Sequence, residues 1–257
     1  MTRATFAPRH GLSLVFGAAL ALHVVDSIVD GLQTDRPWWR LLLAIAATYF
    51  LCICIHDAVH GVLHRHRGVN QVMGFVLGLV VGLPFALLQR AHLLHHQRVG
   101  HDDDPEAVVY RCSLMALPLR LPLIPLLYLR TLTRLRVSQL LLTALHVALI
   151  VIVVGVAEHH GVPVVSTWAP PTLIAVMWFG FTTVWVPHGP DAARFMRFFN
   201  AHSGWHDDHH ADPRYGFPQY AQLRAHRLVV GDATPVSAGE LRRTQRLGGP
   251  LWPVSAS

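Results

Sequence analysis

Long apolar runs constrain the fold of this chain more than any other feature of its sequence. Residues 139–157 and 164–186 contain no Asp, Glu, Lys or Arg, and residues 11–32 and 38–55 form two further apolar runs. A helix of about 20 apolar residues spans the hydrocarbon core of a bilayer. Because 52% of the residues are hydrophobic and only 14% are charged, we expect an integral membrane protein. This composition excludes a disordered chain, a secreted disulfide scaffold and a coiled coil.

Two other apolar segments are interrupted and are not expected to be regular spans. Residues 72–88 are short, rich in glycine and broken at Pro84, which favours a re-entrant hairpin packed against neighbouring helices through its small residues. Residues 113–129 contain three prolines and Arg120, which favours a broken or interfacial helix. The sequence therefore predicts an all-α, polytopic membrane helical bundle with about four full spans and a re-entrant or interfacial hairpin.

No internal repeat divides the chain, so we expect a single integral-membrane domain over residues 1–233. Residues 234–257 are rich in Pro, Gly, Ser and Arg and are expected to form a polar, loosely ordered tail. The net charge of +6 comes from arginine alone, since the chain has no lysine. Membrane headgroups, and not nucleic acid, are the expected partners of this charge. The three cysteines form no CxxC pair and are interpreted as helix-packing residues.

Nineteen histidines are the second unusual feature of the sequence. They form three clusters, which begin at His56 (HDAVH), His92 (HLLHH) and His206 (HDDHH). On a helix, spacings of three and four residues place the imidazoles on one face. A random chain of this composition would contain about 0.1 copies of HxxHH, whereas this chain contains two. The clusters are therefore interpreted as metal-binding motifs and not as a histidine-rich surface.

The composition of the clusters limits the kind of metal site. Neutral imidazole is a good ligand for iron, copper and zinc, and one ion takes four to six ligands. Eight clustered histidines therefore indicate two metal ions. A zinc hydrolase is disfavoured because HExxH is absent, and the Glu-x-x-His motif of soluble di-iron bundles is absent too.

The clusters can form one site only if they lie on the same side of the membrane. The spans at 11–32 and 38–55 return the chain to its starting side before the first cluster, and the spans at 139–157 and 164–186 do so before the third. The second cluster lies on this side too if residues 72–88 enter the membrane and return to the same side without crossing it. Most arginines fall on this side as well: Arg65, Arg67, Arg90, Arg98, Arg130, Arg134, Arg136, Arg194 and Arg197. Because cytoplasmic loops are enriched in arginine, we predict that the histidine cap and both termini are cytoplasmic, in a bacterial inner membrane.

The runs HDAVHG, RAHLLHH followed by HDDDPE, and WHDDHHADPRYGFPQY resemble the three histidine boxes of the membrane fatty acid desaturase superfamily. The resemblance covers most of residues 55–223. It implies a non-haem di-iron centre, O2 as a co-substrate, attack on an unactivated C–H bond of a lipid, and an external electron donor. The implied iron ligands are His56, His60, His92, His95, His96, His206, His209 and His210, with His188 in WVPHGP as a further candidate.

The superfamily contains enzymes with different substrates, and several interpretations of the reaction and the substrate stay open. LPFALLQRAHLLHH resembles acyl-lipid desaturases, which makes the introduction of a double bond into a fatty acyl chain the leading interpretation. HDAVHG followed by Asn70 and Gly74, and the VPH before the third box, also resemble β-carotene ketolases or hydroxylases. An alkane or acyl hydroxylase and a non-enzymatic metal-binding membrane protein are further alternatives. Because the chain has no GxGxxG, haem or ferredoxin motif, the electrons are expected from a separate ferredoxin-, rubredoxin- or cytochrome-like protein.

Residues near the boxes are assigned supporting roles. Asp57, Asp207 and Asp208 are candidates to accept the second ring N–H of a ligand histidine. Residues 102–104 form an acidic turn that is either solvated or in contact with the second box. Six other histidines are expected to be solvated (His64, His66), to be candidates for contact with a ligand histidine (His101, His202), or to pack or join a polar network within spans (His23, His146). Four aromatic side chains could line an apolar channel or simply pack: Trp178, Phe179, Phe181 and Trp185.

Overall fold

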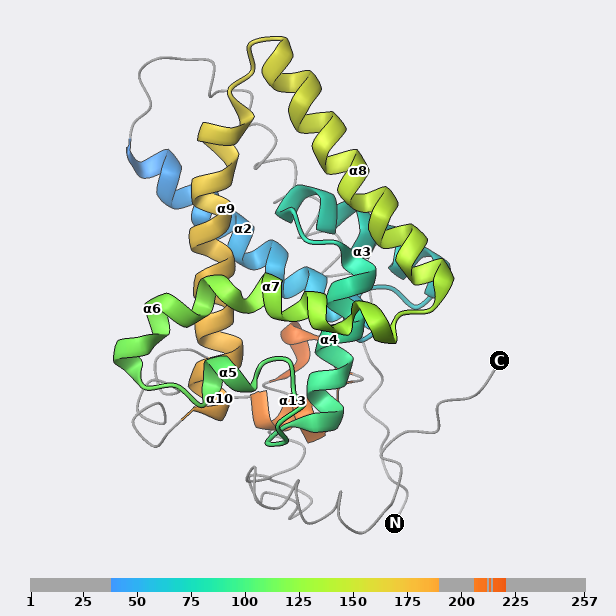
Figure 1. Ribbon diagram of the computed structural model, residues 1–257, viewed down its shortest axis with the longest axis vertical. Helices are drawn as coiled ribbons and strands as arrows, with labels where there is room; N and C mark the ends of the chain where they lie inside the picture. The colour runs from blue at the N-terminus through green and yellow to red at the C-terminus, as the bar shows by residue number, and fades with distance from the viewer. Residues whose placement is uncertain (1–37, 190–205, 212, 214, 221–257) are drawn as a thin grey trace.

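The computed structural model describes residues 38–189, 206–211, 213 and 215–220. The predicted span at 11–32, the predicted tail at 234–257 and the side chains of His23 and His202 lie outside these ranges. Within them every regular element is a helix, which confirms the all-α fold class (Figure 1).

Four helical segments of the described chain are long and apolar enough to cross a membrane: Trp38–Val59, Leu114–Arg134, Val137–His159 and Val164–His188. α2 (Trp38–Val59) packs against α9 (Val164–Gly180), and α8 (Val137–His159) is joined to α9 by a short loop. α9 continues through a π-helical turn, η5 (Phe181–Trp185), into α10 (Val186–His188). Two of these helices, α2 and α8, also carry the predicted spans at 38–55 and 139–157, which are extended by a few residues at their ends.

The exposed apolar surface of α8 indicates that the bundle is surrounded by lipid. In the most apolar part of this helix only 11% of the residues are buried, compared with 67% in α2. Val151, Ile152 and Val153 are each more than half exposed. An apolar surface of this length is not stable in water, whereas hydrocarbon accommodates it. α8 therefore forms a lipid-facing side of the bundle.

A sharp bend separates the next two helices, α3 (Arg67–Val81) and α4 (Phe85–Arg98), whose axes differ by 103°. The bend begins at Gly82, whose φ of 72° is in the left-handed region that glycine adopts without strain. The predicted break of this segment is thus confirmed, while its re-entry on the same side of the membrane stays a prediction. The residues from 85 onward belong to α4 and not to the preceding helix. α4 consequently carries the whole second histidine cluster away from the membrane-facing part of α3.

The predicted small-residue face of this hairpin is also present. A Cβ atom at Gly78 would lie 2.6 Å from the carbonyl oxygen of Leu83 and 2.7 Å from Cε1 of His146. His146 itself is buried on α8, where its ring packs 4.4 Å from that of Phe75. The predicted packing role of His146 is confirmed, and the absence of a side chain at Gly78 lets α8 and the hairpin approach.

The proline-containing segment Leu114–Arg134 is broken into short helical pieces. These pieces lie across α9 in Figure 1 and do not run beside it. They are η2 (Leu114–Ala116), α6 (Leu117–Arg120), η3 (Leu121–Leu123), α7 (Ile124–Tyr128) and η4 (Leu129–Arg134). The interruption predicted from the prolines is therefore confirmed. Its inner side buries Leu117, Ile124 and Tyr128 against the rest of the bundle.

Four elements meet at one end of the bundle. The ends of α2, α4 and α10 come together there with the short helix α13 (His206–Ala211). Two clusters of buried apolar side chains flank this meeting point: one contains Leu51, Ile55 and Leu77, and the other contains Ala91 and Trp185. The packing of these clusters fixes the helix ends, and with them the histidines, relative to one another.

Replacement of Gly78 by valine is expected to lower the thermal midpoint of the purified protein in detergent. The added side chain must displace a backbone carbonyl, and such overpacking costs about 1–3 kcal/mol. Gly155→Val on α8 is the matched control, because a Cβ atom there meets nothing within 4 Å. Equal thermal midpoints for the two variants would contradict the close approach of α8 and the hairpin.

Candidate metal centre

The nine histidines singled out in the sequence come from four different elements. His56 lies in the last turn of α2 and His60 directly after it, and His188 ends α10. α4 contributes His92, His95 and His96, and α13 contributes His206, His209 and His210. Spacings of three and four along α4 and α13 turn these imidazoles to one side of each helix. The structure brings all nine together.

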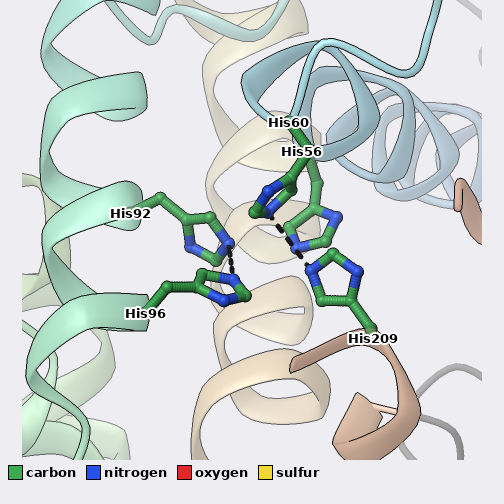
Figure 2. Close-up of side chains that lie close together, drawn as sticks. All are labelled: His56, His60, His92, His96 and His209. Carbon is green, nitrogen blue, oxygen red and sulfur yellow. Dashed lines mark hydrogen bonds between the residues drawn. The ribbon is translucent and has the colours of Figure 1, made fainter. Parts of the chain in front are cut away.

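Five of the nine form one group around a common centre. One ligand nitrogen from each of His56, His60, His92, His96 and His209 lies within 4.8 Å of all the others. Figure 2 shows these rings pointing toward one another from three separate elements. Nε2 of His92 is 3.0 Å from Nε2 of His96, and Nε2 of His60 is 3.2 Å from Nε2 of His209.

The second group contains His95, His188 and His210, again with ligand atoms within 4.8 Å of one another. Nε2 of His95 lies 3.3 Å from Nε2 of His188. His206 adjoins this group, since its Nε2 is 3.0 Å from Nε2 of His210. The structure therefore brings His188, which precedes the third box by 18 positions, directly beside histidines of the second and third boxes.

The two groups are adjacent and share one pocket of imidazoles. The ring of His96 in the first group stacks on the ring of His210 in the second, with centroids 4.0 Å apart. Each of these residues has a near neighbour on its own helix in the other group, because His95 precedes His96 and His209 precedes His210. The arrangement is therefore that of one centre with two halves.

The distances suit metal ions as the common partner. Two nitrogen ligands that each lie about 2.1 Å from one ion are roughly 3.0–3.4 Å apart, which matches the separations of 3.0–3.3 Å between Nε2 atoms. A neutral imidazole has only one donor and one acceptor nitrogen. A cation at each group would satisfy all of the converging lone pairs at once.

A buried carboxylate fixes the orientation of His95. Nδ1 of this histidine lies 3.0 and 3.1 Å from the two carboxylate oxygens of Asp104, which also accept hydrogen bonds from the Tyr110 hydroxyl and the backbone N–H of Glu106. Because Nδ1 is engaged with Asp104, Nε2 is the ring nitrogen that faces the second group. Such a carboxylate–histidine pair is typical of metal sites.

Burial keeps two of these histidines, His60 and His210, in the form that binds metal. Burial, together with His92 and His95 nearby, lowers the pKa of His60 well below its usual value. Burial, with His188 and His95 as neighbours, lowers the pKa of His210 in the same way. Both imidazoles are therefore neutral near pH 7, and only neutral imidazole offers a lone pair to a metal ion. At His95 burial also lowers the pKa, but the carboxylates of Glu106 and Asp104 outweigh it and raise this pKa to about 9.

The acidic turn divides into two parts with different roles. Asp104 is buried in the site, whereas Asp102 and Asp103 are on the surface, where they pair with Arg111 (2.7 Å) and with Arg98 (3.6 Å). Both interpretations of this turn are thus correct, each for different residues. No local pattern distinguishes among three consecutive aspartates.

Asp57 has a different role from the one expected. Its carboxylate is 3.9 Å from Nδ1 of His56, which is too long for a hydrogen bond. The two oxygens instead accept from the backbone N–H of Phe217, at 3.2 Å each. Asp57 therefore ties the segment after the third box to the end of α2, and Tyr220 in that segment packs its ring 5.3 Å from His209. The side chains of Asp207 and Asp208 lie outside the described residues.

The other predicted residues fall outside both groups. His64 and His66 contact each other at the surface end of α2, which agrees with their predicted solvation, and His101 is exposed. The expectation that His101 would contact a ligand therefore finds no support. Trp185 is completely buried and donates to the carbonyl of Cys112, so its role is packing.

An apolar pocket borders the first group. Its walls include Cys52, Ile55 and Leu83 with Phe179 of α9, and it reaches His56 and His92 of the centre. The remaining lining residues are Val59, Leu88, Glu106, Ile124, Pro125, Tyr128, Val176, Gly180, Thr183 and Val184. Of the aromatic residues proposed as a channel, Phe179 lines this pocket, while Trp178 and Phe181 line a second, more open groove between α2 and α9.

Sequence reasoning missed three polar residues at the site: Glu106, Tyr110 and Tyr128. Tyr110 donates to Asp104, and Tyr128 donates to Glu106 at 2.7 Å. Burial of the Glu106 carboxyl by itself would raise its pKa, but His95 and His92 beside it hold this pKa at about 2. The signal that could have identified Glu106 is its place in HDDDPE, directly after the second box.

Comparison with known proteins gives one match. A family model described as fatty acid desaturase matches residues 36–235, a range that contains both histidine groups. No curated protein and no solved structure matches the chain.

Asp104→Ala is expected to weaken metal binding about 10–100-fold, the usual cost of removing a carboxylate that orients a ligand histidine. Metal content of the purified protein, measured by elemental mass spectrometry after dialysis against a weak chelator, tests this. Asp102→Ala removes a neighbouring carboxylate that pairs only at the surface, and it should retain its metal. Equal metal loss in both variants would show that the turn acts through folding alone.

Proposed function

Because the chain belongs to the fatty acid desaturase family, we propose that it is an oxygen-dependent membrane di-iron oxidoreductase that introduces a double bond into a fatty acyl chain of a lipid. The observation that carries this proposal is the pair of adjacent histidine groups at the end of a lipid-facing bundle. A metal-storage protein would have no need of an apolar pocket that leads to the first group.

The histidines of the two groups would hold the two iron ions. When bound, these ions supply the redox chemistry that activates O2 and removes hydrogen from an unactivated C–H bond. The reaction as a whole takes two hydrogen atoms from the acyl chain and two electrons and two protons from outside, and it reduces O2 to two molecules of water. The chain has no motif for a cofactor that stores electrons, so a separate ferredoxin-, rubredoxin- or cytochrome-like protein would deliver them.

The protein's own part in the reaction is to place the substrate and to exclude water. Leu83, Val176 and Phe179 give the pocket apolar walls, which suit a run of methylene groups and not a polar headgroup. His56 and His92 form the boundary between the pocket and the centre. A methylene group held at this boundary would be the part of the acyl substrate closest to the metal ions. The depth of the pocket would therefore decide which carbon reacts.

The arginines fit a cytoplasmic position for the site. Six of the arginines assigned to this side are exposed: Arg65, Arg67, Arg98, Arg130, Arg134 and Arg136. In membrane proteins this enrichment marks the cytoplasmic side, here that of a bacterial inner membrane. The same surface offers positive charge to an acidic electron donor.

Lipid analysis tests the reaction directly. The protein would be produced with a suitable reductase system in a bacterial host engineered to make β-carotene, and total lipid and pigment extracts compared by mass spectrometry. We expect acyl chains that are lighter by two hydrogens. Oxygen added to β-carotene with unchanged acyl chains would instead make the protein a carotenoid ketolase or hydroxylase, and oxygen added to acyl chains or alkanes would make it a hydroxylase.

Histidine variants in the same assay test whether activity depends on the two histidine groups and not on histidines outside them. His209→Ala, which removes a member of the first group, should abolish product formation. His64→Ala is the matched control, because His64 belongs to neither group, and it should leave activity unchanged. Full activity in the His209 variant would contradict the proposed centre.

Filling the pocket should stop the reaction without removing the metal. Val176→Trp places a large side chain in the pocket wall, and we expect little product together with a wild-type iron content. Leu173→Trp, on the same helix but 53% exposed, is the control. Wild-type activity in the Val176 variant would show that the substrate binds elsewhere.

A further inference from the structure

Glu106 occupies a position between the two histidine groups. Its side chain is about 1% exposed, and it follows the acidic turn at the start of α5 (Ala107–Tyr110). One carboxylate oxygen faces the first group and the other faces the second. The two oxygens have different surroundings, and the difference indicates what the residue does.

The first oxygen, Oε1, is fully engaged with protein groups. It accepts a hydrogen bond of 2.7 Å from the hydroxyl of Tyr128 and lies 3.5 Å from Nδ1 of His92. His92 belongs to the five-histidine group, and its Nε2 contacts His96 in that group. Oε1 therefore holds the Nδ1 side of His92 and leaves its Nε2 toward the metal position.

The second oxygen, Oε2, has no hydrogen-bond donor among the described residues, although it is completely buried. It lies 3.5 Å from Nε2 of His95. That nitrogen belongs to the second histidine group, and Nδ1 of the same ring is held by Asp104. A buried carboxylate oxygen without a donor is costly unless a cation neutralises it.

The distance to His95 is that of two ligands on one ion. Atoms that each lie about 2.1 Å from a metal ion are roughly 3.4 Å apart in tetrahedral geometry. The second group has three nitrogen donors, His95, His188 and His210, and His206 adjoins it as a fourth. Because an iron ion takes four to six ligands, the shell still has room for an oxygen ligand where Oε2 lies.

We propose that Glu106 is a metal ligand: Oε2 binds the ion held by the three-histidine group, while Oε1 stays with Tyr128 and orients His92 of the five-histidine group. The two ions would then have different shells, one of nitrogen only and one that includes a carboxylate oxygen. One residue would also connect the two halves of the centre. This inference rests on the proposed metal centre and not on the identity of the substrate.

Iron binding by variants of the full chain tests the inference. The protein, purified in detergent and freed of metal, is titrated anaerobically with Fe²⁺ enriched in ⁵⁷Fe, and bound iron is counted and examined by Mössbauer spectroscopy. We expect two different ferrous signals in the wild type. Glu106→Gln should weaken binding of one ion at least tenfold and remove or shift only its signal, the same one that His188→Ala removes.

Tyr128→Phe is the matched control, because it removes the hydrogen bond to Oε1 and keeps the carboxylate. It should bind two ions with both signals. If Glu106→Gln does not fold, as judged by gel filtration, Glu106→Asp replaces it, since the shorter carboxylate no longer reaches the second group and should affect the same signal.

Two results would overturn the inference. One is a folded Glu106→Gln protein that binds iron with wild-type affinity and spectrum. The other is an equal effect of Tyr128→Phe and Glu106→Gln on both signals, which would mean that Glu106 only positions the histidines. Failure of the proposed function is distinguishable, since it would appear in the wild type as uptake of fewer than two ions. In that case the inference stands only if Glu106→Gln weakens the binding of the remaining ion tenfold.

Discussion

The close approach of nine imidazoles, buried at the end of an apolar bundle, is the interaction on which the rest of the structure depends. Separations of 3.0–3.3 Å between Nε2 atoms are unfavourable for so many polar groups unless cations lie between them. Buried rings, carboxylates behind them and the exclusion of water are all required together. Asp104, Glu106, Tyr110 and Tyr128 supply the buried polar contacts that make this packing possible.

Irregular features of the helices serve the same purpose. The bend of 103° after α3 turns α4 toward the end of α2, so that two motifs 36 residues apart face each other. The broken segment at 114–134 delivers Tyr128 to the site from the side. The π-helical turn η5 lies directly before His188, and such turns recur at functional sites because they re-aim the residues that follow them. A bundle of straight helices would not place these side chains together.

Sequence reasoning identified the site by residue type and spacing, and its misses share one cause. Histidines three or four positions apart lie on one face of any α-helix. The three clusters could therefore be identified from the sequence alone. Asp57 was expected to hold a ligand ring but holds Phe217 instead. Of three adjacent aspartates only Asp104 enters the site. Glu106 was overlooked because its neighbours come from α4 and α7, which are distant in sequence.

The sequence by itself determined that the chain is a helical membrane bundle, where its helices break, and which histidines have the spacing of metal ligands. These properties follow from local patterns: apolar length, glycine and proline positions, and the period of the α-helix. Only the tertiary structure decided how the histidines divide into groups of five and three, that His188 belongs to the smaller group, and that Glu106 lies between them. Those relations depend on how separate helices pack, and packing is a property of surfaces that the chain brings together only when it folds.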